Sequence, residues 1–125
     1  MVQRKSKTTR RAFVDHVLDM LDELDSVRAR AMFGGHGIYV DDLMIGLIAD
    51  GVFYLKGDAQ SRSLFEAEGS EPFRYQRKGR SEPVAMSYWE APVDAMESRE
   101  SLCGWARIAL LAAKRAPAGR KRKSR

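Results

Sequence analysis

Residues 32–56, MFGGHGIYVDDLMIGLIADGVFYLK, decide the fold class of this 125-residue chain. The stretch is rich in β-branched and aromatic residues and is interrupted twice, by Asp41-Asp42 and by Asp50-Gly51. Both pairs are turn formers, and an Asp-Gly pair suits a two-residue turn in which both φ angles are positive. The pattern therefore predicts consecutive antiparallel strands joined by short hairpins.

The glycines that open this stretch raise the alternative of a phosphate-binding loop. Such a loop needs a helix N-terminus directly after its glycines. Strands are predicted there instead, so we interpret Gly34, Gly35 and Gly37 as parts of a hairpin. The same turn is our candidate surface for contact with another protein, and it comprises Met32, Phe33, Gly34, Gly35 and His36.

Amphipathic helices are predicted near both ends of the chain. Apolar residues recur at spacings of three and four over residues 9–24 and again over residues 99–114. Ser98 is placed to cap the second helix, and Cys103 lies on its apolar side. The only cysteine of the chain is therefore expected to be a core residue.

Shorter elements are expected between the meander and the last helix. A brief middle helix is predicted over residues 59–68, with Asp58 as its cap and with Leu64 and Phe65 packed inward. The alternation in PFRYQRKGR and in VAMSYWEAP predicts two paired strands, and a first strand is expected directly before the glycines. The fold class is α+β: a two-layer domain with an antiparallel meander sheet of about five or six strands, N-terminal and C-terminal helices and a short middle helix.

The charges are segregated along the chain. Residues 1–11 hold five cations and no acid, and residues 114–125 hold seven cations and no acid. The net charge of +5 therefore conceals a body, residues 12–113, that carries −7. We expect a disordered basic arm over residues 1–9, one folded domain over residues 10–116 and a disordered basic tail over residues 117–125.

Several classes of protein are disfavoured by the sequence. No stretch reaches the roughly 20 apolar residues that span a bilayer, and the charged start lacks a signal-peptide core, so we expect a cytoplasmic protein without a membrane partner. Neither His16 nor His36 has metal-ligand spacing. Asp41 and Asp42 fall in one turn and Asp50 in the next, which alternation places at the opposite end of the sheet. No catalytic residue, metal site or cofactor is expected; an enzyme would need a cleft with perturbed carboxylates near His36 or Asp41.

Nucleic-acid binding is the alternative hypothesis. The PFRYQRKGR hairpin interleaves aromatic residues with cations, and the basic tail could hold phosphates without reading sequence. The acidic body makes protein contacts the favoured hypothesis, because a folded reader of DNA presents a cationic face. The candidate nucleic-acid contacts are Arg74, Arg77, Lys78, Arg80, Arg120, Lys121, Arg122, Lys123 and Arg125.

The chain resembles the TfoX N-terminal domain family, whose founding members are regulators of natural competence in bacteria. The resemblance rests on RAMFGGHGIYVDDLMIGLIADGVFYLK, EPFRYQRKGR, AMSYWEAP and WARIALLAAKRA, and it covers about residues 10–116. It implies a two-layer α+β domain without catalytic residues. We therefore expect a non-enzymatic regulatory or adaptor domain that contacts an unidentified protein partner or forms a homodimer. Full-length competence regulators of this family also carry a helical C-terminal domain, whereas PAGRKRKSR follows the domain here.

Overall fold

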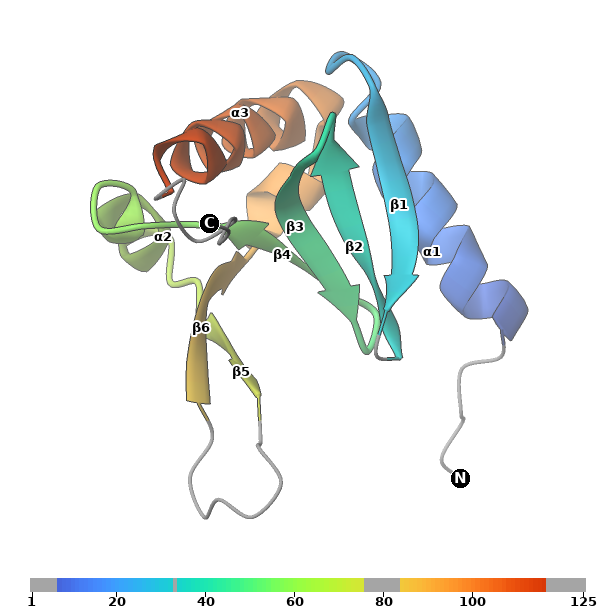
Figure 1. The fold of residues 1–125 in the computed structure, drawn as a ribbon, viewed down its shortest axis with the longest axis horizontal. Coiled ribbons are helices and arrows are strands. Elements are labelled where there is room, and N and C mark those ends of the chain that lie inside the picture. The colour runs from blue at the N-terminus through green and yellow to red at the C-terminus, as the bar shows by residue number, and fades with distance from the viewer. Residues whose placement is uncertain (1–6, 33, 76–83, 117–125) are drawn as a thin grey trace, which may run out of the picture.

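The computed structural model describes residues 7–32, 34–75 and 84–116. Its described strands form one sheet in the order β1-β2-β3-β4-β6-β5, with every neighbouring pair antiparallel (Figure 1). The α+β class and the antiparallel meander predicted from the sequence are confirmed. In chain order the elements are α1 (Lys7–Met20), β1 (Val27–Met32), β2 (Gly35–Val40), β3 (Leu43–Ala49), β4 (Val52–Lys56), α2 (Arg62–Ala67), β5 (Pro72–Tyr75), β6 (Val84–Glu90), the 3-10 helix η1 (Val93–Glu97) and α3 (Arg99–Arg115).

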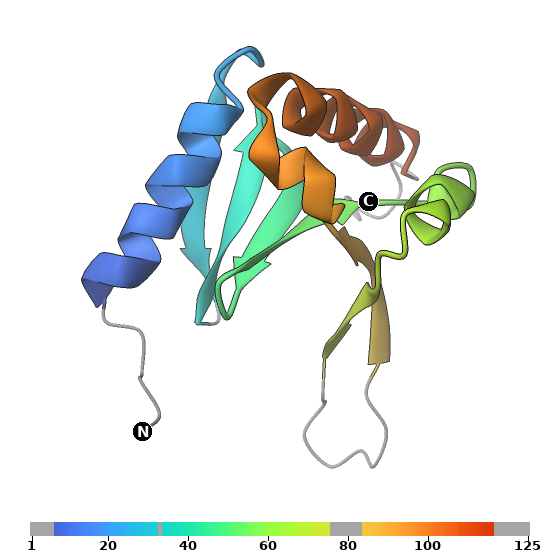
Figure 2. The same ribbon diagram turned by 180° about the vertical axis from the view of Figure 1, so that it is seen from behind.

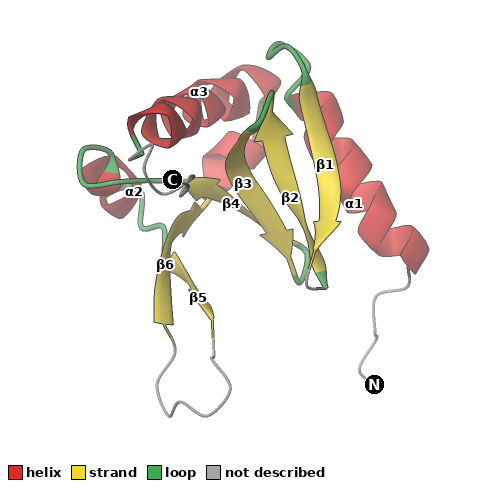
Figure 3. Ribbon diagram, viewed as in Figure 1, coloured by secondary structure: helices red, strands yellow, loops and turns green. Residues whose placement is uncertain are grey.

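The helices α1 and α3 lie on the same face of the sheet and form the second layer (Figures 2 and 3). Alternation along the strands sends every second side chain into the core between the layers. On β4, for example, Phe53 and Leu55 are buried, while Tyr54 between them is partly exposed on the opposite face. The helices contribute apolar residues to the same core, and α3 approaches the sheet closely through alanines such as Ala106 and Ala109.

The hairpin turns behave as their sequences predict. Asp50 and Gly51 have φ angles of 51° and 75°, so both central residues of the β3–β4 turn lie in the left-handed region. Asp41 in the β2–β3 turn has a φ of 54°. The β5–β6 pairing also confirms the predicted partnership of those two strands, which extend away from the helices (Figure 1).

The first helix differs from its predicted bounds at both ends. It begins at Lys7, inside the expected arm, and ends at Met20, although the apolar spacing continues to Leu24. Leu24 donates its amide to the carbonyl of Leu21 in a tight turn, and both side chains remain buried. The apolar spacing overestimates the helix because this turn packs on the same core.

The middle helix corrects two predictions. Phe65 is fully buried, but Leu64 is 46% exposed, because adjacent residues of a helix point about 100° apart and a single turn offers the core only one of them. The helix also starts later than expected, with Ser61 as its N-cap. Asp58 instead closes the preceding turn, where its Oδ1 accepts hydrogen bonds from the amides of Gln60 and Ser61, each at 3.0 Å.

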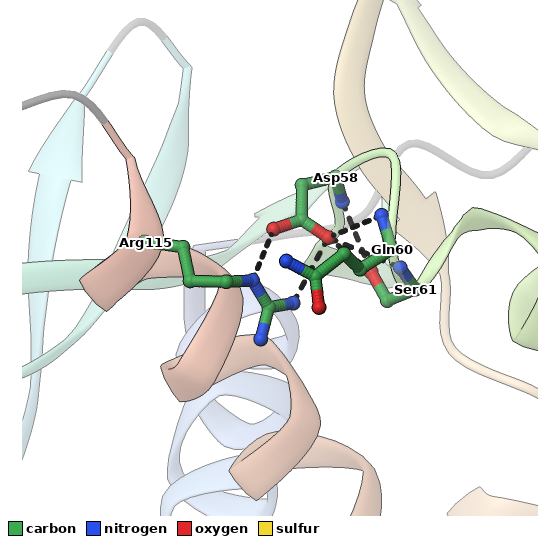
Figure 4. Close-up of polar contacts among 4 residues, drawn as sticks. All are labelled: Asp58, Gln60, Ser61 and Arg115. Carbon is green, nitrogen blue, oxygen red and sulfur yellow. Dashed lines mark hydrogen bonds and ion pairs between the residues drawn. The ribbon is translucent and has the colours of Figure 1, made fainter.

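Asp58 also ties this turn to the end of α3. The Arg115 guanidinium donates to both carboxylate oxygens of Asp58, at 2.8 and 3.0 Å (Figure 4). These hydrogen bonds, together with those from Ser61, lower the pKa of Asp58 to about 2. The contact joins segments 57 residues apart and ties the C-terminal end of α3 to the turn between β4 and α2.

The predictions for α3 hold. The Ser98 side chain caps the helix by accepting a hydrogen bond from the amide of Ser101 at 3.1 Å. Cys103 is fully buried, and its Sγ lies 3.2 Å from the carbonyl oxygen of Met20. Burial raises the pKa of the Cys103 thiol. Among the helices that the structure describes, none has the length and apolar character needed to cross a bilayer.

Candidate functional site

A shallow cavity of about 170 Å³ lies at one corner of the domain. Three segments that are distant in sequence meet there: the N-terminal half of α1, the β1–β2 turn and the β3–β4 turn. We call this place the glycine corner, and it is lined by Arg10, Phe13, Val14, Gly34, Gly35, His36, Ile48, Asp50 and Gly51. An open groove continues from it along the end of β1, past Arg11, Ala31 and Met32.

The glycines shape the corner in two different ways. Gly34 has a φ of +78° and turns the chain between β1 and β2, as the hairpin interpretation predicts. Gly35 is instead the first residue of β2, and a Cβ on it would lie only 2.2 Å from the carbonyl oxygen of Ile48. The absence of a side chain at Gly35 allows β2 and β3 to approach each other here. A strand follows these glycines, so the helix N-terminus of a phosphate loop is absent from this position.

His36 is not in a turn, which corrects our prediction. It is the second residue of β2, where it pairs with Ala31 of β1 and with Ile48 of β3. These partners lie on the face that the helices cover, and His36 is half-buried beside α1. The prediction failed because the turn itself is shorter than the cluster of glycines suggests.

The corner combines an apolar floor with a polar rim. Phe13, Val14 and Ile48 come from the core and form most of the wall. Arg10 and Asp50 are exposed at the rim. Asp58, whose pKa is strongly lowered, is not among the lining residues. This arrangement suits the insertion of an apolar side chain flanked by polar contacts.

The other predicted site residues are distributed as follows. Met32 lines the groove beside the corner, whereas Phe33 lies outside the described residues. Arg74 is exposed on β5 and pairs with Glu71 at 3.6 Å. The remaining candidate nucleic-acid contacts also lie outside the described residues, namely Arg77, Lys78, Arg80, Arg120, Lys121, Arg122, Lys123 and Arg125.

The three aspartates considered as a metal site are separated. Asp41 and Asp42 connect β2 to β3, while Asp50 lies at the other end of β3, in the turn to β4. Over residues 7–32, 34–75 and 84–116, no group of three or more His, Cys, Asp or Glu side chains is placed to hold a metal ion.

Sequence reasoning missed the contributions of α1 and of the β3–β4 turn to the corner. The sequence indicates only an amphipathic helix around Phe13, a cluster of cations over residues 1–11 that includes Arg10, and a turn at Asp50-Gly51. The alternation that separates Asp50 from Asp41 also brings it beside Gly34, because every second turn of a meander falls at the same end of the sheet. That rule could have identified the meeting of the two turns, although not the position of α1.

The fold and the corner define a class: a small two-layer α+β domain with one antiparallel sheet, helices on a single face and a glycine-shaped cavity at the sheet's end. The model of the TfoX N-terminal domain matches residues 19–113, and the chain belongs to that family.

One relative carries a name that bears on function. The chain is 31% identical over 64 residues to the DNA transformation protein TfoX1 of Aliivibrio fischeri (strain ATCC 700601 / ES114). The alignment covers 51% of this chain and 31% of the relative. The matched part of this chain thus spans about a third of the length of that protein.

Proposed function

We propose that this chain is a non-enzymatic regulatory domain with a role related to DNA transformation, and that it acts in the bacterial cytoplasm through protein contacts at the glycine corner. Its family and the name of its relative support the regulatory role. The corner supports the mode of action, because it offers a partner a recess with an apolar floor and a polar rim.

The size of the cavity carries this proposal. Sites for cofactors and other small molecules usually enclose roughly 300–1,000 Å³. The corner provides about 170 Å³, close to the space filled by a single anchoring side chain, and the groove that continues from it, of about 860 Å³, is open to solvent along the end of β1. A recess beside an open groove suits an anchoring side chain and the flanking segment of a protein partner better than an enclosed small molecule. Its ionisable lining residues are Arg10, His36 and Asp50, and the rest of the lining is apolar side chain or glycine.

Position-specific photocrosslinking in the native host cell tests the proposal. A photoreactive phenylalanine replaces Arg10 at the rim in one variant and the exposed Leu111 of α3 in a control variant. We expect a discrete protein adduct from position 10 alone, which His36→Glu in the same chain abolishes. His36→Glu should also change the same transcripts as deletion of the gene. Equal amounts of adduct from positions 10 and 111 would contradict action through the corner. So would a His36→Glu variant that changes the same transcripts as gene deletion when no adduct forms at position 10.

Nucleic-acid binding is retained as a second candidate because the cations are concentrated at the chain ends. In this alternative the chain holds DNA non-specifically through its basic tail and the Arg74–Arg80 hairpin. Deleting residues 117–125 and titrating random duplex DNA over a salt series tests it. If about six phosphates are engaged, affinity should fall roughly a thousandfold between about 50 and 200 mM salt. A salt-insensitive affinity, or one unchanged by the deletion, would refute tethering by the tail.

A homodimer is part of the proposal as one way to cover a sheet edge. Sedimentation velocity should then give twice the mass of the monomer. A monomer at all concentrations would remove the dimer and leave the corner proposal intact.

A further inference from the structure

The strand β1 is one of the two edge strands of the described sheet, and the longer of the two over the residues that the structure describes. It spans Val27–Met32 and, among the described strands, pairs only with β2 (Figure 1). The other edge strand, β5, has four described residues and begins with Pro72, which has no amide to donate. An unpaired edge presents backbone donors and acceptors to any extended chain that can lie beside it. The edge at β1 is therefore the one best suited to accept an added strand.

The edge strand carries fixed positive charge on one face. Arg28 and Arg30 alternate with small residues, so both project from the face opposite the helices, and both are exposed. Their guanidinium carbons lie 5.2 and 5.7 Å from the ring centroid of Tyr39 on β2. Cation–π attraction to one ring therefore holds both cations near Tyr39.

The two arginines differ in their pairing. Arg28 lies 3.7 Å from the carboxylate of Asp42 and donates to the carbonyl of Asp41. Within the described part of the chain, no carboxylate forms an ion pair with Arg30. The edge thus retains an uncompensated cation although the body of the domain is acidic.

A second copy of this chain is a poor occupant of the β1 edge, so the proposed homodimer would use the other edge, β5. Two antiparallel β1 strands related by a two-fold axis must place opposite side chains on the same face. One such register sets Arg28 opposite Arg30, and the next sets Arg30 opposite Arg30. Like charges directly opposite each other destabilise a strand pair. The basic ends of the chain are disfavoured for the same reason.

We propose that β1 accepts an extended acidic segment of a partner protein as an added strand, with carboxylates at alternate positions opposite Arg28 and Arg30. Backbone hydrogen bonds supply affinity and the alternating charges supply specificity. The segment would run to the groove beside Met32, which Arg10 and Arg11 also line. Arg11 is paired there with Asp15 of α1 at 3.1 Å, so the charge specificity rests on Arg28 and Arg30. The inference rests on the proposed function, because it names the chemistry of the protein partner that the regulatory domain contacts.

A synthetic strand peptide tests the charge pattern directly. Fluorescein-labelled peptides TVEVEVT and TVKVKVT are titrated with the full chain and followed by anisotropy. The acidic peptide should bind at least about tenfold more tightly, because opposite-charge cross-strand pairs replace like-charge pairs at two positions. Equal affinity of the two peptides would overturn the proposal.

Charge exchange in the protein locates the site. Arg30→Glu should weaken binding of the acidic peptide and strengthen binding of the lysine peptide. Arg62→Glu on α2 should leave both affinities unchanged. Arg30→Gln, which keeps a side chain of similar length, provides the milder variant if the reversal unfolds the protein. If Arg62→Glu reduces the preference for the acidic peptide as much as Arg30→Glu does, the effect comes from overall charge, and a site at β1 is refuted.

Backbone methylation distinguishes strand addition from charge attraction. Alternate amides of a strand point to opposite edges, so the acidic peptide is N-methylated at one alternate set or at the other. Methylation of the amides that face β1 should abolish binding. Methylation of the other set should leave the affinity within about threefold of that of the unmethylated peptide. Equal effects of the two patterns, or tighter binding of a random single-stranded oligonucleotide that also depends on Arg30, would overturn the proposal. If the acidic peptide binds at β1 but no protein crosslinks to position 10 in the cell, the corner proposal fails and this one stands. If the crosslink forms but the peptide does not bind, this proposal fails and the corner proposal stands.

Discussion

Replacing Gly35 by alanine should destabilise the domain far more than replacing its neighbour Gly34. A Cβ on Gly35 would lie 2.2 Å from the carbonyl oxygen of Ile48, whereas carbon–oxygen contacts are normally at least about 3.3 Å. The obstacle is backbone, so β2 and β3 must separate by about 1 Å where His36 pairs with Ile48. Overpacking typically costs about 1–3 kcal/mol, and we expect a loss near 3 kcal/mol here because backbone cannot move aside as a flexible side chain can. The total stability of a domain is roughly 5–15 kcal/mol.

The control at Gly34 isolates the close approach from backbone strain. Gly34 has a φ of +78° and open space around its Cβ position, so alanine there should cost only about 1 kcal/mol. Urea unfolding followed by the fluorescence of Trp89 and Trp105 gives both free energies, and the melting temperature of Gly35→Ala should fall by roughly 10 °C. Equal losses for the two variants would refute the inference that Gly35 is required by the contact between β2 and β3.

Three further predictions concern the packing of α2 and α3 on the core. Because the pKa of Asp58 is lowered to about 2, its contribution is complete above the unfolded pKa near 4 and is lost as the pH falls through 2. Asp58→Asn should therefore cost about 1 kcal/mol at pH 7, an amount reduced for the partial exposure of the side chain, and its deficit should shrink in acid denaturation curves. Cys103 is buried with a raised pKa, so a thiol reagent should label it at the rate of unfolding; rapid labelling of the native protein would contradict its position. Phe65→Ala should cost about 3–5 kcal/mol and Leu64→Ala less than about 1 kcal/mol in urea unfolding, and similar losses would argue against the orientation of α2.

The sequence predicted the sheet well because its strands and turns carry local signals. Asp50-Gly51 fixes a turn through its own backbone preferences, and alternation in the flanking strands fixes which side chains are buried. The caps and bounds of the helices were less predictable. Asp58 is occupied by Arg115, a partner 57 residues away that no local pattern reveals, and the middle helix begins only at Arg62.

The candidate site was predictable only in part for the same physical reason. The glycine turn attracted notice through its composition, yet the cavity exists because α1 crosses over it and contributes Phe13. Helix placement depends on how two apolar surfaces pack, and spacing along the chain does not determine that geometry. The positive charge at the β1 edge was likewise not predictable. Arg28 and Arg30 alternate with apolar residues as in any strand with one exposed face, and this pattern does not show that β1 lies at the edge of the sheet.

The distribution of ion pairs explains how an acidic body can present a basic edge. The acids in the turn after α1 face arginines of α3: Arg99 contacts Asp22 at 3.0 Å, and Arg107 contacts Glu23 at 3.5 Å. Exposed pairs of this kind add little stability, but each cancels the local field of its carboxylate. Arg30, at the far edge of the sheet, has no such partner among the described residues. The net negative charge of the body therefore argues against binding of a polyanion along the whole surface. It does not oppose binding of a short acidic strand beside β1, because salt screens the charges of the rest of the body and only a few residues near the strand interact with it.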